Sequence, residues 1–171
     1  MLLRSLIVGC VLFAASQVID AQEVTYLQGD QPAFSVIYPA GWIVRTPRVE
    51  GRNVISSYPI DGGLLWQGLW VMRDVSTIEE SIERLQSMEL GLFEDTELTK
   101  EPWVEAVNGV EVHRYSGSGL FKGETPVETL MSFFEVAGEK VGVVGYIGEP
   151  KAIETHRADL ERMLDSLAVE R

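Results

Sequence analysis

The end of the chain holds a strand pattern that is apolar on both faces, followed by the pattern of an amphipathic helix. Side chains of residues 141–147 alternate between two faces, and both faces are apolar. A strand of this kind needs cover on both sides, so it predicts a layered protein. After Pro150, apolar residues recur at helical spacing: Ile153, Leu160, Met163, Leu164 and Leu167. Because Gly142 and Gly145 carry no side chain, we expect a helix to pack close to the strand there.

Residues 64–72 form a second stretch that is apolar on both faces. Trp66, Trp70 and Met72 fall on one face, and Leu65, Leu69 and Val71 on the other. This pattern predicts a central strand with layers above and below it.

A helix is predicted over residues 77–90. Ser76 and Glu79 have the spacing of a capping box, in which a side-chain oxygen accepts a bond from a free helix N–H while the glutamate reaches back. Apolar residues then follow at helical period: Ile78, Ile82, Leu85, Met88 and Leu92.

The dipeptide Asn108-Gly109 predicts a β-hairpin between strands 103–107 and 110–115, because both residues tolerate the positive φ of a two-residue turn. The register places His113 and Tyr115 on the same face as Glu111. The opposite face is expected to carry Trp103, Glu105, Val107, Val110, Val112 and Arg114.

Shorter strand patterns complete the chain. Residues 22–32 are expected to form a loose lead-in or a short edge strand near residues 24–27. A strand near 34–38 turns at Pro39 and Gly41 to return at 42–45. Further strands are predicted at 53–58 and 127–136, while the stretch 116–119 and the turn at Lys122-Gly123 lead into the latter. Strands joined by tight turns pair antiparallel, so the fold class is α+β, an antiparallel sheet flanked by helices.

The first 21 residues have the pattern of a secretory signal peptide. Arg4 is the charged region, residues 6–15 are apolar, and Ala21 ends a plausible cleavage site. We expect residues 22–171 to form one exported domain, periplasmic or secreted. The apolar run is about half the roughly 20 residues that a membrane span requires. Residues 7–10 also resemble a lipoprotein box ending at Cys10, but the apolar region before it is too short.

Charge and cysteine content narrow the possible partners. The formal net charge is −12, and Cys10 is the single cysteine. An acidic surface disfavours nucleic acid and anionic lipid, and it is compatible with a basic partner protein or cations. Since Cys10 would leave with the signal, the mature chain would hold no disulfide and no thiolate. We expect a monomer stabilised by its core.

Catalytic and cofactor motifs are not found in the sequence. Residues 115–119 lack the G-x-S-x-G spacing of a nucleophile elbow, and residues 117–123 miss the dinucleotide pattern and precede a strand. We therefore predict no catalytic residue, no cofactor and no metal ligand, and a non-catalytic binding role.

Alternatives to that role remain. His113 with Glu111 and Tyr115 could form a polar relay in a hydrolase-type enzyme. Glu94, Asp95, Glu97, Glu101 and Glu105 could bind a divalent cation through carboxylate oxygens. His156 is expected to be a polar residue beside the apolar stripe of its helix. Trp66, Trp70, Trp103 and Tyr146 could line an apolar ligand groove or pack in the core.

Four features together resemble the Mog1/PsbP-like superfamily. They are the segment 34–42 with its Pro-x-Gly-Trp turn, the central strand 64–72 with its following helix, the Asn108-Gly109 hairpin, and the closing strand and helix. The resemblance covers nearly all of residues 22–171. It implies an α/β/α sandwich around an antiparallel sheet and a non-catalytic accessory role. It assigns no functional residue, so Trp66, Trp70, His113 and Tyr115 remain the candidate ligand-binding residues.

Overall fold

The computed structural model describes residues 20–46, 48–49, 52–72, 74–87, 93–98, 101–138 and 140–170. Their largest element is an antiparallel sheet in which β9 also pairs with β10. In spatial order its other strands are β3 (Trp42–Arg45), β6 (Ile55–Pro59), β7 (Leu65–Val71), β12 (Lys140–Gly148), β11 (Thr125–Val136), β10 (Val110–Phe121) and β8 (Phe93–Leu98). The extra strand β9 is Trp103–Val107.

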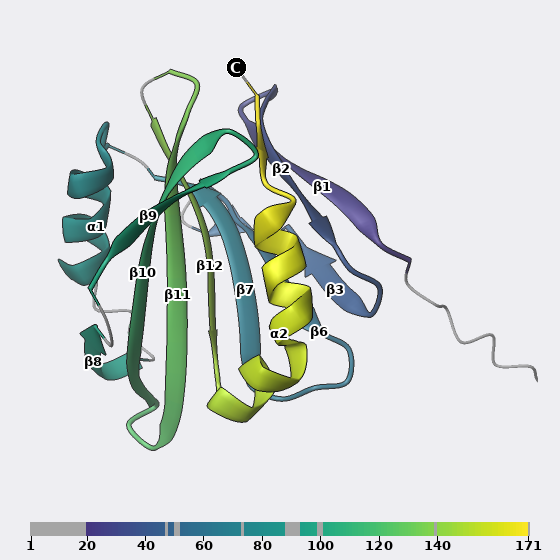
Figure 1. The fold of residues 1–171 in the computed structure, drawn as a ribbon, viewed down its shortest axis with the longest axis vertical. Helices are drawn as coiled ribbons and strands as arrows, with labels where there is room; N and C mark the ends of the chain where they lie inside the picture. Colours follow the sequence, from purple (N-terminus) through teal and green to yellow (C-terminus); the bar gives the residue numbers. More distant parts are fainter. Residues whose placement is uncertain are drawn as a thin grey trace, which may run out of the picture.

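Two helices, α1 (Ile78–Ser87) and α2 (Pro150–Asp165), cover opposite faces of this sheet (Figure 1). Val143 and Val144 are neighbours on β12 and therefore point to opposite faces. Val144 packs in a cluster with α2, and Val143 packs in a second cluster with α1. The predicted α+β class is confirmed, and the central strand predicted at residues 64–72 is β7, between β6 and β12.

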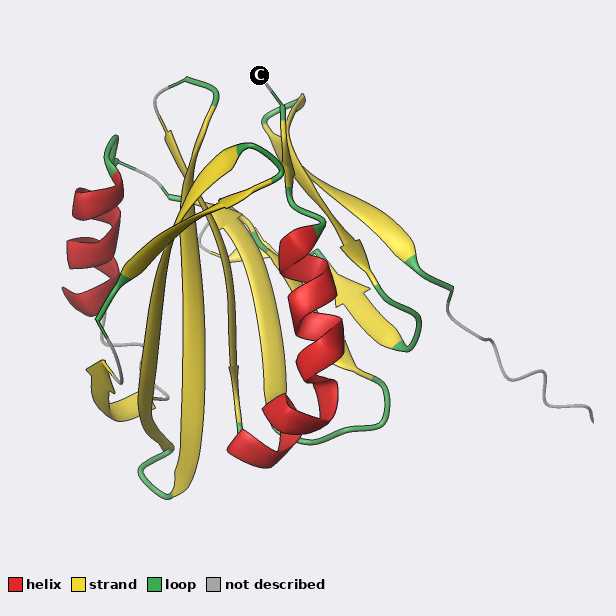
Figure 2. Ribbon diagram, in the orientation of Figure 1, coloured by secondary structure: helices red, strands yellow, loops and turns green. Residues whose placement is uncertain are grey.

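A smaller sheet contains β1 (Gln22–Gln28), β2 (Gln31–Tyr38) and β13 (Ala168–Val169), with β2 in the middle (Figure 2). The predicted edge strand is β1. The prediction that the chain returns alongside β2 at residues 42–45 is wrong, because β3 pairs with β6 in the main sheet. Gly41 has a φ of 85° and its carbonyl accepts a bond from the Ile60 N–H, so the turn carries the chain from one sheet to the other. A short hairpin of β4 (Arg48–Val49) and β5 (Arg52–Asn53) follows β3.

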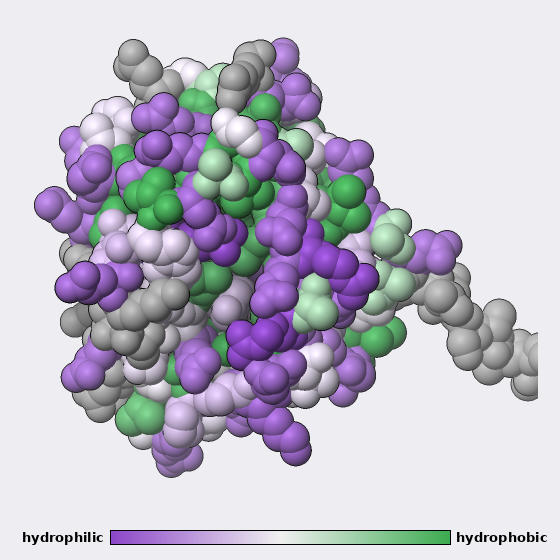
Figure 3. All heavy atoms as spheres, viewed as in Figure 1, coloured by the Kyte–Doolittle hydropathy of each residue, from purple (hydrophilic) through white to green (hydrophobic). Residues whose placement is uncertain are grey.

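The smaller sheet and α2 bury the first cluster together. Phe34, Tyr38 and Trp42 are at most 1% exposed. The Phe34 ring stacks on Tyr26 at 5.2 Å and meets Phe134 of β11 edge-on at 5.0 Å, which joins the two sheets. Helix α2 adds Ile153, Leu160, Met163 and Leu164, while its outward side is polar (Figure 3). Leu167 is buried as predicted, but it follows the helix, which ends at Asp165.

One polar group lies deep within this cluster. Gln67 of β7 is 2% exposed, and its Oε1 accepts hydrogen bonds from the hydroxyls of Tyr38 (2.5 Å) and Ser57 (2.8 Å). Burial raises the pKa of Tyr38 well above its ordinary value, and bonds to Ser57 and Gln67 offset part of the rise. The bonds tie β2 of the smaller sheet to β6 and β7 of the main sheet.

The expectation that a helix packs against Gly142 and Gly145 is wrong. The space beside Gly142 is filled by the Phe134 ring, 2.5 Å from where a Cβ would stand, and that beside Gly145 by the Met131 sulfur. Both residues belong to β11, so the glycines accommodate large side chains of the adjacent strand.

The capping box of helix α1 lies one residue later than the predicted pair of Ser76 and Glu79. The Thr77 Oγ1 accepts a bond from the Glu80 N–H (3.1 Å), and the Glu80 carboxylate accepts one from the Ser76 N–H (3.0 Å). The capping pair is therefore Thr77 and Glu80. Ile78, Ile82 and Leu85 pack in the second cluster as predicted, and Met88 and Leu92 lie outside the described residues.

The Asn108-Gly109 hairpin is confirmed, with Val107 opposite Val110 and positive φ at both turn residues. The Asn108 amide also donates to the carbonyls of Asp165 (2.7 Å) and Leu167 (3.1 Å), so the turn is held at the end of α2. Residues 116–119, expected to be a lead-in, belong to the long strand β10, which continues to Phe121. Backbone pairing with β8 and β11 on its two sides explains this continuation.

Candidate functional site

The four candidate ligand-binding residues share one face of the main sheet. Directly paired residues of neighbouring strands point the same way, and the pairs run from Trp70 through Val143 and Phe133 to His113. This is the face that α1 covers. However, β7 and β10 are three strand spacings apart, about 14 Å, and α1 packs over β11 between them. The structure therefore separates Trp66 and Trp70 on β7 from His113 and Tyr115 on β10, and the four residues do not form one site.

Trp66 and Trp70 form a stacked pair on β7. Their rings lie 6.3 Å apart at 28°, and both side chains are half-buried. Trp66 lies over Gly68, where a Cβ would collide with its ring, and its indole N–H donates to the Ser56 hydroxyl (2.6 Å). The Trp70 N–H lies 3.3 Å from the Met72 sulfur. Since both N–H groups have partners within the protein, the accessible ring surface offers apolar contact.

The surroundings of this pair extend onto β6 and β3. Ser56 is opposite Gly68, so Tyr58 of the same strand lies on the same face as Trp66. The Arg45 guanidinium stands 5.5 Å from the Tyr58 ring centre, a cation–π contact. Trp70 packs against both clusters, whereas Trp66 is in neither cluster of described residues. We call Tyr58, Trp66 and Trp70 the aromatic patch, which α1 leaves partly accessible.

Trp103 and Tyr146 do not join the patch. Trp103 is opposite Arg114 and Tyr146 is opposite Gln67, which places both on the face that α2 covers. They pack against the first cluster. The hypothesis of one groove lined by four aromatic residues is wrong, because the pleat of the sheet sends the two pairs to opposite sides.

His113 and Glu111 make the contact that a proton relay requires. His113 Nε2 lies 3.0 Å from Glu111 Oε1, and their side chains are 21% and 75% exposed. Tyr115 is directed elsewhere: its ring meets Phe133 edge-on at 5.6 Å. Burial, and secondarily the charge of Glu79, raise the pKa of Tyr115. The pair could transfer a proton at the surface, but the expected trio is not formed.

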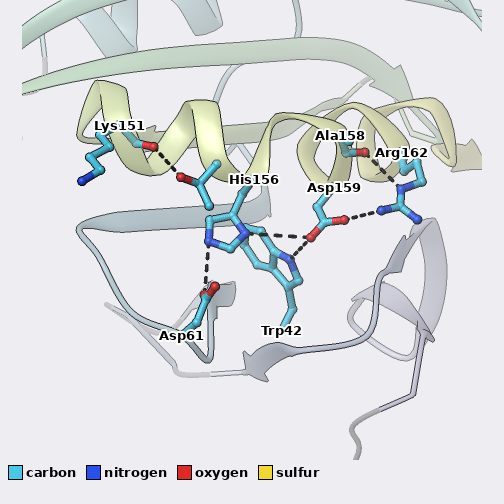
Figure 4. A network of polar contacts seen from close by, with 8 residues as sticks. Trp42, Asp61, Lys151, His156, Ala158, Asp159 and Arg162 are labelled. Carbon is cyan, nitrogen blue, oxygen red and sulfur yellow. Dashed lines mark hydrogen bonds and ion pairs between the residues drawn. The ribbon is translucent and has the colours of Figure 1, made fainter.

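A polar network around His156 is the part that sequence reasoning missed (Figure 4). His156 Nε2 is 3.2 Å from Asp61, in the turn after β6, and its ring packs edge-on against Trp42 at 5.8 Å. Asp159 accepts a bond from the Trp42 indole N–H (3.2 Å) and pairs with Arg162. The His156 side chain is only 11% exposed, so it is not simply a polar flank of the helix. It fastens α2 to the β6–β7 turn, and the i, i+3 spacing of His156 and Asp159 was the available signal.

The acidic run at residues 94–105, considered as a divalent-cation site, spans most of β8 and the start of β9. Glu105 pairs with Arg114 at 2.6 Å, and Glu97 lies on β8 opposite Ser118. The side chains of Glu94 and Asp95 lie outside the described residues. Within the described ranges, no group of three or more histidine, cysteine, aspartate or glutamate side chains is placed to hold a metal ion. No helix among these ranges is long and apolar enough to cross a membrane.

Comparison with known proteins shows which solved structures have a similar architecture. No protein-family model and no curated protein sequence matches the chain. Among solved structures, cyanobacterial PsbP (CyanoP) from Synechocystis sp. PCC 6803 superimposes with a TM-score of 0.64 at 12% identity, over 91% of this chain and 96% of that one. The Ran-binding protein Mog1p of Saccharomyces cerevisiae superimposes at 0.54 and 14% identity, over 88% and 96%.

The chain has the Mog1/PsbP-like fold. A Pseudomonas aeruginosa protein of unknown function, described as a putative regulator, is also similar, with a TM-score of 0.50 and 10% identity over 87% of this chain and 97% of that one. The expected resemblance is thus confirmed at the level of the fold. At these identities the Mog1/PsbP-like fold carries over no residue role, so any site has to be argued from this chain's own side chains.

Proposed function

We propose that this chain is an exported, monomeric, non-catalytic binding protein of the cell envelope, with residues 1–21 as signal peptide and residues 22–171 as the working domain. The aromatic patch is its contact surface, and it takes a small apolar ligand or apolar groups of a partner protein. The Mog1/PsbP-like fold supports a binding or accessory role, since one structural neighbour is itself a Ran-binding protein.

The observation that carries the proposal is the stacked Trp66–Trp70 pair. Tryptophan side chains are highly buried on average, and both of these half-buried side chains keep part of their surface accessible on the sheet. Their orientation is set by the stacking contact and by the bond to Ser56. A rigid aromatic surface loses little conformational entropy when it binds, which favours this position over flexible apolar side chains.

The patch is tested with a solvent-sensitive naphthalene dye as the apolar probe. Excitation of tryptophan at the patch should give energy transfer to bound dye, and the double variant Trp66→Ala and Trp70→Ala should bind it about tenfold or more weakly, because each ring supplies on the order of 1 kcal/mol or more of contact. Dye fluorescence titration measures this affinity.

The matched control is Val104→Ala, which removes apolar surface from β9, where Val104 is 54% exposed and away from the patch. It should leave dye affinity unchanged. If the control weakens binding as much as the double variant, or if neither changes it, the patch is not the contact surface.

Export is tested by the mass of the mature protein. The signal peptide predicts cleavage after Ala21, which would leave β1 intact because that strand begins at Gln22. Protein recovered from the periplasm or medium should therefore start at Gln22. A protein that keeps its first 21 residues and remains with the cytoplasmic fraction would refute the export proposal.

One observation supports a second candidate function, that of a hydrolase-type enzyme. The 3.0 Å contact between His113 and Glu111 has hydrogen-bond geometry suited to a general base. Turnover of a generic ester or glycoside by the purified protein, abolished in His113→Ala, would favour the enzyme over the binding protein.

A further inference from the structure

Strands β10 and β11 separate from each other at one end of the main sheet. Their pairing ends at His113 opposite Phe133. Beyond this point β10 continues in register with β9, up to Val110 opposite Val107, and β11 continues with β12, up to Val136 opposite Lys140. In Figure 1 the β9–β10 hairpin bends across toward the end of α2, while the β11–β12 hairpin runs on straight. The two hairpins therefore form the arms of a V.

The opening of this V is held in place by named contacts. Asn108, at the tip of the β9–β10 hairpin, donates to the carbonyls of Asp165 and Leu167 at the end of α2. Val107 and Val112 of the same hairpin are buried in the first cluster. The separation is thus built into the packing, and the tip of the hairpin is anchored at the end of α2.

A cavity of about 540 Å³ lies in the V, within the roughly 300–1,000 Å³ of ligand pockets. Apolar side chains from several elements form part of its lining, including Ile78, Val110, Val136 and Val169. Its charged lining residues are Glu111, Glu135 and Glu170, which are exposed, and no lysine or arginine of the described ranges lines it. The cavity combines apolar walls with an acidic rim.

Besides the apolar walls and the acidic rim, the cavity is bordered by strand backbone. At residues 110–111 and 135–136, each strand has its partner on the far side, so the edges that face the cavity take part in no strand pairing among the described residues. A strand edge of this kind carries N–H and C=O groups able to pair with another extended chain. Apolar pockets beside such an edge give specificity for alternate side chains.

We propose that this V is a docking site for a short extended segment of a partner protein in which lysine or arginine alternates with apolar residues. The segment would pair with the open strand edges, place its apolar side chains against the valines, and place its basic side chains at Glu111, Glu135 and Glu170. The choice of a basic segment rests on charge complementarity with this rim. The site uses other strands than the aromatic patch and does not depend on it.

The probe for this site is a fluorescein-labelled, acetylated and amidated peptide of sequence Lys-Val-Lys-Val-Lys, followed by fluorescence anisotropy at low salt. The triple variant Glu111→Gln, Glu135→Gln and Glu170→Gln should weaken binding about tenfold, since exposed ion pairs each contribute modestly. Glutamine keeps the size of each side chain, and at position 111 it keeps an oxygen that can accept from His113. Ala137→Lys, which places a positive charge beside the cavity, should weaken binding as well.

A matched triple variant controls for total charge. Glu83→Gln, Glu101→Gln and Glu124→Gln remove the same charge from exposed positions outside the cavity and should leave affinity within about twofold, the size of a screened long-range effect. A Lys-Pro-Lys-Pro-Lys peptide has the same charge but lacks N–H groups at the proline positions, so it should bind weakly. Equal weakening by the two triple variants, or equal binding of the two peptides, would overturn the proposal.

Discussion

Replacement of Phe34 by alanine is expected to lower the free energy of unfolding by about 3–5 kcal/mol, the range for deleting a buried aromatic ring. Phe34 is fully buried, stacks on Tyr26 and meets Phe134 edge-on. Its loss would leave a cavity at the junction between the smaller sheet and the main sheet. Urea denaturation followed by circular dichroism measures the change.

The control is Ile37→Ala on the same strand. Ile37 points outward and is 48% exposed, so its truncation should cost less than about 1 kcal/mol. Because both variants remove a large apolar side chain from β2, strand propensity alone would affect them alike. If Phe34→Ala costs no more than Ile37→Ala, the smaller sheet is not packed on the main sheet as described.

Alkaline pH is expected to destabilise the protein through Tyr38. Burial raises the pKa of Tyr38, so above about pH 10 its hydroxyl ionises in the unfolded chain while the folded chain keeps the proton. The contribution to stability is fully present below the unfolded-state value and is lost as pH rises toward the folded-state value. The loss approaches about 1.4 kcal/mol per pH unit. Urea midpoints between pH 9 and pH 11.5 measure it.

Two variants separate ionisation from hydrogen bonding. Tyr38→Phe removes the ionisable group and should flatten the alkaline dependence, leaving the smaller part due to Tyr115 and Tyr146, whose pKa values burial also raises. Ser57→Ala removes the other donor to Gln67, so it should cost about 1 kcal/mol at neutral pH and keep the alkaline slope. An unchanged slope in Tyr38→Phe would contradict this assignment.

Features set by neighbouring residues could be predicted from the sequence. The two-sided apolar pattern identified β7 and β12 as inner strands, and Asn108-Gly109 identified a hairpin with the correct register. Both depend on contacts within a few residues or on the alternation of a single strand. The same alternation placed Trp66 and Trp70 on one face, and His113 with Glu111 on one face, as observed.

Features set by distant residues could not be predicted. The turn at Gly41 looks the same locally whether β3 returns beside β2 or crosses to β6, and the crossing depends on contacts with distant residues, such as the packing of Trp42 against His156. Strand β13 has two residues and exists only because β2 offers its edge. Whether Trp103 faces the same way as Trp66 depends on registers across several strands, and the sequence carries no local signal for these.

The pairing of β13 with β2 joins the beginning of the domain to its end. Ala168 lies opposite Ser35, and the Glu170 N–H donates to the Ala33 carbonyl (3.0 Å). The β1–β2 hairpin therefore gains its third strand only after residues 39–167 have been synthesised. Such closure between residues far apart in sequence slows folding, because loop entropy must be overcome first. A chain that completes this sheet so late leaves the edge of β2 unpaired during synthesis.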